Sequence, residues 1–131
     1  MRLKDVFKDA KYSVWGSEGV SFEDPTQGDI GDCWMIAASS VTAQDPERIK
    51  EVFLIENLNT AGVYAVKLHM MGIPVTVVVD DYLPFWNNTE DLIYGKEGPD
   101  NSLWMPILEK AAAKLFGNYE VMVGGWMGPA I

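Results

Sequence analysis

The stretch Gln27-Gly28-Asp29-Ile30-Gly31-Asp32-Cys33-Trp34 joins a loop to a helix, and the interpretation of the whole chain depends on it. Residues 16–31 contain glycines and a proline at short intervals, which is typical of a loop. Asp32 stands where a helix N-cap is expected, and residues 33–44 follow with small residues and good helix formers. We therefore predict a buried helix with Cys33 at its N-terminus.

A helix N-terminus suits a nucleophilic thiol, because its unpaired N–H groups and partial positive charge favour the thiolate. An acyl-transfer enzyme also needs a donor directed at the oxygen that becomes negative in the tetrahedral intermediate. Gln27 supplies a side-chain amide six positions before Cys33. The glycines at positions 28 and 31 would let the loop fold back and bring this amide to the Cys33 N–H, and Trp34 would shield the site from water.

The next elements are predicted from start signals and composition. Asp45-Pro46-Glu47 is a helix start, and the helix is expected to extend to about Leu54. Residues 62–70 and 73–80 have the composition of strands, and Met71-Gly72 between them is expected to form the turn of a hairpin.

The last third of the chain is predicted to be a loop, a helix and a tail. Residues 87–101 are polar and are expected to form an exposed loop. Ser102 is expected to cap a helix over 103–116 that ends at Gly117. Residues 121–131 carry no charge and join no clear element, so we expect them to need a partner surface.

Composition limits the classes of function. The chain has 131 residues, of which 48% are hydrophobic, and this suffices for one packed domain. Its formal charge of −9 argues against nucleic acid as a partner, and no apolar run has the length of a transmembrane segment. Cys33 is the only cysteine and His69 the only histidine, which excludes an internal disulfide and a dense zinc site. A single free thiol fits a cytoplasmic location.

Four motifs, in order, resemble the calpain family of cysteine proteases within the papain-like clan. The first is the octet that begins at Gln27. Residues 77–84 (VVVDDYLP) resemble the family's strand and turn, and residues 103–114 (LWMPILEKAAAK) resemble its Trp-containing helix. Residues 117–125 (GNYEVMVGG) resemble the segment that follows. The motifs extend from about residue 24 to residue 125.

The resemblance implies an α/β (α+β) papain-like half-domain with a central helix, packed helices and a small antiparallel sheet. Residues 24–131 match the first lobe of the calpain protease core, and residues 1–23 form an N-terminal segment and loop. This lobe carries the nucleophile, Cys33, and the oxyanion donor, Gln27, with Trp34 in the cleft wall. The partner is a second lobe that supplies His and Asn and is absent here, so we expect the chain alone to be inactive and the joined lobes to hydrolyse protein substrates through a thioester.

The resemblance also implies one calcium ion. Asp24 matches the family's ligand carboxylate, and the backbone carbonyls of Ser17 and Gly19 occupy the matching loop positions. The family's second carboxylate is replaced here by Ser102, which removes one charged ligand; Asp100 or Asn101 would have to take its place.

Two other functions are compatible with the sequence. A non-catalytic calpain-like regulatory or interaction module is the first, although the presence of both Cys33 and Gln27 argues against it. A redox-sensing thiol domain is the second, and it lacks a second cysteine to resolve a sulfenic acid. The pair Asp80-Asp81 is expected to end a strand, and Glu109 and Lys110 are expected to be solvated or structural.

Overall fold

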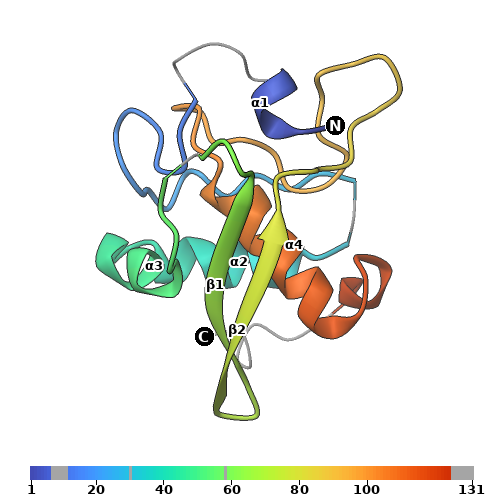
Figure 1. Ribbon diagram of the computed structural model, residues 1–131. Coiled ribbons are helices and arrows are strands. Elements are labelled where there is room, and N and C mark those ends of the chain that lie inside the picture. The colour runs from blue at the N-terminus through green and yellow to red at the C-terminus, as the bar shows by residue number, and fades with distance from the viewer. Residues whose placement is uncertain (7–11, 30, 58, 125–131) are drawn as a thin grey trace.

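A two-stranded hairpin and one long helix behind it organise the computed structural model, which describes residues 1–6, 12–29, 31–57 and 59–124 (Figure 1). The mixed architecture confirms the predicted α/β (α+β) fold class. The elements follow in this order: α1 (Leu3–Val6), α2 (Cys33–Thr42), α3 (Pro46–Val52), β1 (Val63–Met70), β2 (Ile73–Asp80), α4 (Trp104–Phe116) and the 3₁₀ helix η1 (Glu120–Met122). No helix of the described part is long and apolar enough to span a membrane.

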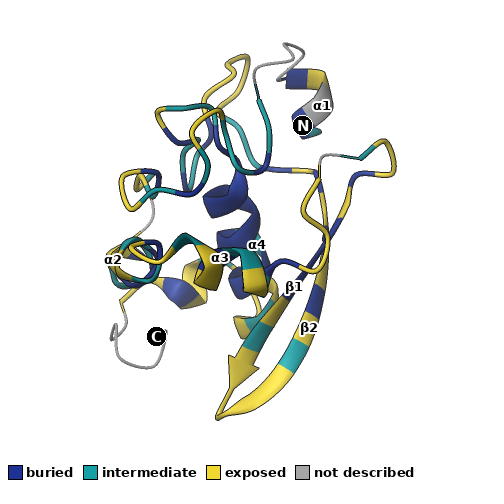
Figure 2. Ribbon diagram, turned by 90° about the vertical axis from the view of Figure 1, so that its left-hand side faces the viewer, coloured by how far each residue is buried: buried dark blue, intermediate teal, exposed yellow. Residues whose placement is uncertain are grey.

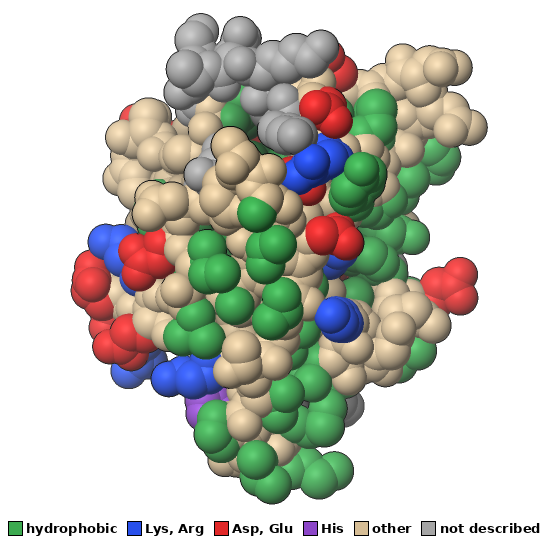
Figure 3. Space-filling view, viewed as in Figure 1, with side chains coloured by type: hydrophobic (Ala, Val, Ile, Leu, Met, Phe, Trp, Pro, Cys, Tyr) green, Lys and Arg blue, Asp and Glu red, His purple; other side chains and the backbone are tan. Residues whose placement is uncertain are grey.

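The hairpin forms where the sequence predicts it. Strands β1 and β2 pair antiparallel, from Val63 opposite Asp80 to Met70 opposite Ile73. The two turn residues both have positive φ, 52° for Met71 and 78° for Gly72, which is the requirement of a type I′ turn. The strands carry an apolar surface toward the tip of the hairpin, where Figure 3 shows hydrophobic side chains gathered.

Helix α4 is the most deeply buried helix of the described chain, and it packs on one face of the hairpin (Figures 1 and 2). Its first residue, Trp104, is 0% exposed. Pro106 lies in the first turn, where its missing N–H is tolerated, and Gly117 ends the helix with φ 121°. Ser102 does not cap it: Leu103 occupies the N-cap position, and no side chain bonds to the first turn.

Helices α2 and α3 pack against each other, and α3 contacts β1. Helix α2 buries only one face, formed by Met35, Ala38 and Ser39, so the expectation of a buried helix holds for that face alone. Helix α3 begins at Pro46 as predicted but ends before residue 53. The chain becomes extended at Phe53, because the next N–H, that of Leu54, bonds to the Ala65 carbonyl of β1 at 2.8 Å.

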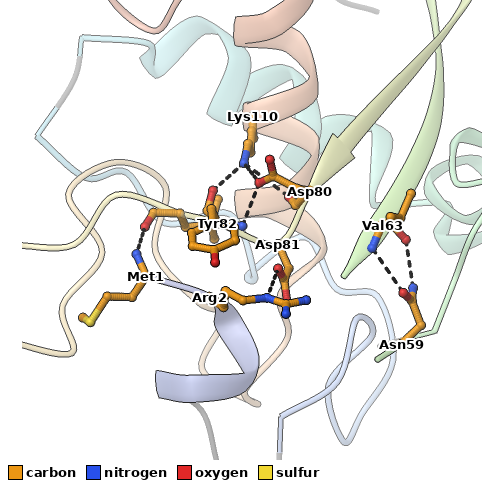
Figure 4. A network of polar contacts seen from close by, with 9 residues as sticks. Met1, Arg2, Asn59, Val63, Asp80, Asp81, Tyr82 and Lys110 are labelled. Carbon is orange, nitrogen blue, oxygen red and sulfur yellow. Dashed lines mark hydrogen bonds and ion pairs between the residues drawn. The ribbon is translucent and has the colours of Figure 1, made fainter. Parts of the chain in front are cut away.

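The N-terminal residues are held by the end of β2 (Figure 4). The Met1 ammonium group donates to the Leu83 carbonyl at 2.8 Å, and Arg2 Nε donates to Asp81 Oδ1 at 2.8 Å. Asp80 forms an ion pair with Lys110 of α4. The pair Asp80-Asp81 therefore ends the strand, as expected, and also joins it to two other segments.

The expectation of an exposed loop over residues 87–101 is wrong for its second half. Leu92, Gly95 and Gly98 are buried. Backbone hydrogen bonds connect residues 93–96 to residues 26–29, so this half of the loop supports the segment that precedes Cys33. Of the predicted tail, residues 121–124 are described and Met122 is buried, whereas residues 125–131 lie outside the described part.

Candidate active site

Cys33 is the first residue of α2 and its side chain is exposed as a free thiol. Asp32 occupies the predicted N-cap position but its side chain makes no capping hydrogen bond. The Asp32 carbonyl instead accepts the N–H groups of Met35, at 2.8 Å, and Ile36, at 3.2 Å. A helix begins at Cys33, as predicted, and solvent reaches the sulfur.

Gln27 is exposed, and the segment that carries it is held by backbone contacts on both sides. The Thr26 carbonyl accepts the Lys96 N–H at 3.0 Å, and the Asp29 N–H donates to the Ile93 carbonyl at 2.8 Å. Gly28 is required by close approach: a Cβ there would lie 1.8 Å from the Tyr94 carbonyl oxygen. Position 28 therefore requires glycine because any side chain there would clash with the backbone of Tyr94.

Trp34 is half-buried and is fixed by two contacts. Its Nε1 donates to the Met122 carbonyl at 2.7 Å, and its ring meets Phe116 edge-on with 6.3 Å between centroids. Trp34 lines a groove of about 500 Å³ between α2, α3, β1, α4 and η1, and Cys33 is not among the lining residues. The exposed His69 of β1 also lines this groove.

The predicted calcium ligand Asp24 is buried, with 1% of its surface exposed. Its Oδ2 accepts hydrogen bonds from Trp104 Nε1, at 2.7 Å, and from the Ser21 N–H, at 2.8 Å. Burial raises the pKa of Asp24, the two donors lower it, and the negative charge of Asp100 raises it further.

Asp100 connects the loop of Ser17 and Gly19 to the start of α4. Its Oδ2 accepts the Glu18 N–H at 3.1 Å, its backbone carbonyl accepts the Ser17 N–H at 3.2 Å, and its Oδ1 accepts the Ser102 N–H at 3.2 Å. The Ser102 hydroxyl is buried, and its contact with the Asp24 carboxylate lowers the pKa of Asp24. Within the described ranges, no group of three His, Cys, Asp or Glu side chains is arranged to hold a metal ion.

Glu109, which is expected from the sequence to be solvated or structural, is a buried acid. It is 1% exposed, and its Oε2 accepts the Gly95 N–H at 2.8 Å. Burial, followed by the adjacent Asp32, raises the pKa of Glu109 to about 9. The helical spacing indicates this burial, because Glu109 follows Met105 by four residues and precedes Ala113 by four. All three residues lie on the buried face of α4.

Comparison with known proteins identifies relatives over the whole chain. The sequence model of a family described as "Calpain family cysteine protease" matches residues 1–131. Calpain-type cysteine protease DEK1 of Zea mays is 37% identical over 134 residues, which cover 100% of this chain and 6% of the relative. Calpain-B of Drosophila melanogaster is 38% identical, with 95% and 13% covered. Calpain clp-1 of Caenorhabditis elegans is 38% identical, with 88% and 15% covered, so this chain spans a small part of each relative.

Proposed function

Because the chain belongs to the calpain family of cysteine proteases, we propose that it is the nucleophile-bearing lobe of a calpain-type cysteine endopeptidase. The observation that carries the proposal is the exposed thiol of Cys33 at the first residue of α2. The supporting segment of Gln27 is fixed on residues 93–96, which suits a donor that must be positioned before the reaction.

The proposed reaction has two steps. The Cys33 thiolate attacks the scissile carbonyl carbon, and the Gln27 amide and the Cys33 N–H stabilise the resulting oxyanion. The C–N bond then breaks, the leaving amine takes a proton from the histidine of the second lobe, and a thioester remains on Cys33. Water attacks the thioester, with the same histidine as general base, and releases the carboxylic acid and the thiolate.

We propose that the second lobe is required for activity. The only histidine of this chain, His69, lies in β1 opposite Pro74, within a hairpin whose register is fixed by eight residue pairs. We do not assign it as the general base, so the chain alone is proposed to hydrolyse no peptide. The proposed substrates are proteins, and the charge of −9 argues against nucleic acid as a further partner.

The proposed function is tested by replacing the oxyanion donor in the protein made of this chain joined to a calpain second lobe. We expect Gln27→Ala to lower kcat for peptide hydrolysis by about 10²- to 10³-fold with little change in KM, because the donor acts mainly in the transition state. Gln44→Ala is the matched control, since Gln44 is exposed just after the other end of α2. Equal kcat in the two variants would contradict the role of Gln27.

We also propose a calcium site formed by Asp24, the backbone carbonyls of Ser17 and Gly19, and Asp100 in place of the missing carboxylate. Two observations support it: the negative charge of Asp100 raises the pKa of Asp24, and Asp100 binds the backbone of residues 17 and 18. Calcium prefers carboxylate and carbonyl oxygens, and a cation would offset the repulsion between the two acids.

Calcium is expected to raise the thermal midpoint of this chain. Calcium at 100 times its Kd stabilises the folded state by about 2.7 kcal/mol, which corresponds to several degrees for a chain of this size. We expect the shift in the unmodified chain and in the control Asp91→Asn, where the acid is exposed, and its loss in Asp24→Asn and Asp100→Asn. The absence of a shift at millimolar calcium in the unmodified chain would remove the site.

We propose a cytoplasmic location, because a thiolate nucleophile such as Cys33 must remain reduced. We further propose residues 24–131 as the part that corresponds to the first lobe, with residues 1–23 as an N-terminal segment. The order of the four family motifs supports this division.

A further inference from the structure

Two fully buried acids, Asp32 just before α2 and Glu109 of α4, lie within hydrogen-bonding contact of each other. Asp32, immediately before Cys33, is 0% exposed, and Glu109 of α4 is 1% exposed. Glu109 Oε2 accepts the Gly95 N–H, whereas Glu109 Oε1 and both carboxylate oxygens of Asp32 have no hydrogen-bond donor. Burying three acceptor oxygens without donors would reduce the free energy of unfolding by more than a few hydrogen bonds add to it. The arrangement therefore requires a physical explanation.

A nearby cation does not supply the explanation. The ion pairs of the described residues involve Arg2, Arg48, Lys50 and Lys110, and each of them contacts another acid. Two ionised carboxylates side by side in the interior would repel each other strongly. A protonated carboxyl group, by contrast, is a hydrogen-bond donor, so a single proton turns the repulsion into a hydrogen bond.

We propose that Glu109 and Asp32 share one proton at neutral pH, and that the resulting bond positions the segments that carry Cys33 and Gln27. The pair is suited to this role because it contacts both segments. Asp32 directly precedes Cys33, and Glu109 holds Gly95 within residues 93–96, on which the Gln27 segment rests. The positioning of Cys33 and Gln27 by this pair rests on the proposed function. The shared proton itself does not depend on that function.

The other titratable groups around the pair do not provide the missing charge. The Tyr119 ring stacks on Tyr94 with 4.1 Å between centroids, and burial, followed by the charge of Glu109, raises the pKa of Tyr119, which keeps its phenol neutral. Asp80 at the end of β2 is negative and is paired with Lys110. Lys96, next to Gly95, donates its ammonium group to the Leu92 carbonyl. The proton therefore resides on the carboxyl pair.

The sign of the pH dependence follows from the direction of the shift. The pKa of Glu109 is raised from 4.5 to about 9, so the folded chain holds a proton that the unfolded chain has already released. The stabilisation by this proton is fully present below pH 4.5 and is lost as the pH rises through about 9. Over that interval the unfolding equilibrium constant should rise by up to about tenfold per pH unit.

The test compares Glu109→Gln with the unmodified chain from pH 6 to pH 9. The glutamine amide donates to Asp32 and its oxygen accepts the Gly95 N–H, so the contacts persist without a titratable proton. We expect the unfolding constant of the unmodified chain to rise relative to that of Glu109→Gln as the pH rises. Glu51→Gln, where the acid is exposed on α3, should retain the pH dependence. A carboxylic acid band in the infrared spectrum at pH 7 should be present in the unmodified chain and absent in Glu109→Gln.

The positioning role is tested by the rate at which iodoacetamide alkylates Cys33 as a function of pH. We expect Glu109→Ala to alter the pH profile of alkylation and Glu109→Gln to restore it toward that of the unmodified chain. If Glu109→Ala does not fold, Asp32→Asn, which supplies an amide donor from the other side, should follow Glu109→Gln. Parallel pH slopes together with no acid band would overturn the shared proton. An unchanged alkylation profile in a folded Glu109→Ala chain would overturn the positioning role.

These readouts are separate from peptide hydrolysis. If the joined lobes hydrolyse no peptide while the infrared band and the pH slope are as expected, the proposed function fails and the shared proton stands. If hydrolysis depends on Cys33 and the acid band is absent, the proposed function stands and the shared proton fails.

Discussion

Cys33→Ala is expected to abolish peptide hydrolysis by the protein in which this chain is joined to a calpain second lobe. Without the sulfur no thioester forms, and only the oxyanion donors and substrate binding remain. For nucleophiles that act as a unit with their base, such a loss lowers kcat by about 10⁶-fold. The measurement is kcat for a fluorogenic peptide, with mass spectrometry of the unmodified protein to detect the acyl group on Cys33.

The fold should survive this substitution, because Cys33 is exposed and alanine favours a helix. Ser40→Ala on the same helix is the matched control, and its kcat should remain close to that of the unmodified protein. Circular dichroism checks that all three proteins are folded. Hydrolysis by Cys33→Ala at even a hundredth of the original rate would assign the nucleophile to another residue.

Trp104→Ala should produce the largest loss of stability. Trp104 is 0% exposed at the start of α4, and removal of such a ring costs about 3–5 kcal/mol of unfolding free energy. It also removes the 2.7 Å hydrogen bond from the indole to Asp24 Oδ2, which leaves the buried carboxylate with fewer donors. Because this total approaches the whole stability of a small domain, we expect the variant to be largely unfolded at 25 °C.

Trp104→Phe separates packing from hydrogen bonding. It retains most of the apolar volume and removes the donor, and we expect a loss of about 1.5–3 kcal/mol, as for a hydrogen bond to a charged group. Trp86→Ala is the control, because Trp86 is 50% exposed and also donates to an aspartate, Asp29. Urea unfolding measures all three. Similar losses for Trp104→Ala and Trp86→Ala would contradict the central role of α4.

The local parts of the fold could be predicted from the sequence because short-range rules determine them. Met71-Gly72 permits the positive φ angles of the hairpin turn, and Pro46 fixes the first turn of α3. The octet placed a helix start at Cys33, and the structure has it there. The roles proposed for Cys33, Gln27 and the calcium ligands come from the chemistry of the octet and from the resemblance to the calpain family.

The sequence predictions are wrong where contacts with a segment distant in the chain determine the local structure. Ser102 has the composition of a cap, but its hydroxyl is buried next to Gly98, where a Cβ would come within 2.1 Å of it. The second half of the 87–101 loop is buried because residues 26–29 pair with it. Glu109 is charged in isolation, and the packing of α4 against Gly95 and Asp32 buries it.

The network at the chain start, in which Met1 binds Leu83 and Arg2 binds Asp81, has a consequence for biosynthesis. The ribosome makes Met1 and Arg2 before their partners, which follow them by 82 and 79 residues in the chain. A two-stranded hairpin is at best marginally stable alone, so these partners are themselves not fixed before α4 emerges from the exit tunnel. Residues 1 and 2 therefore acquire these contacts only after the hairpin and α4 have been translated, and the nascent chain must remain free of aggregation until then.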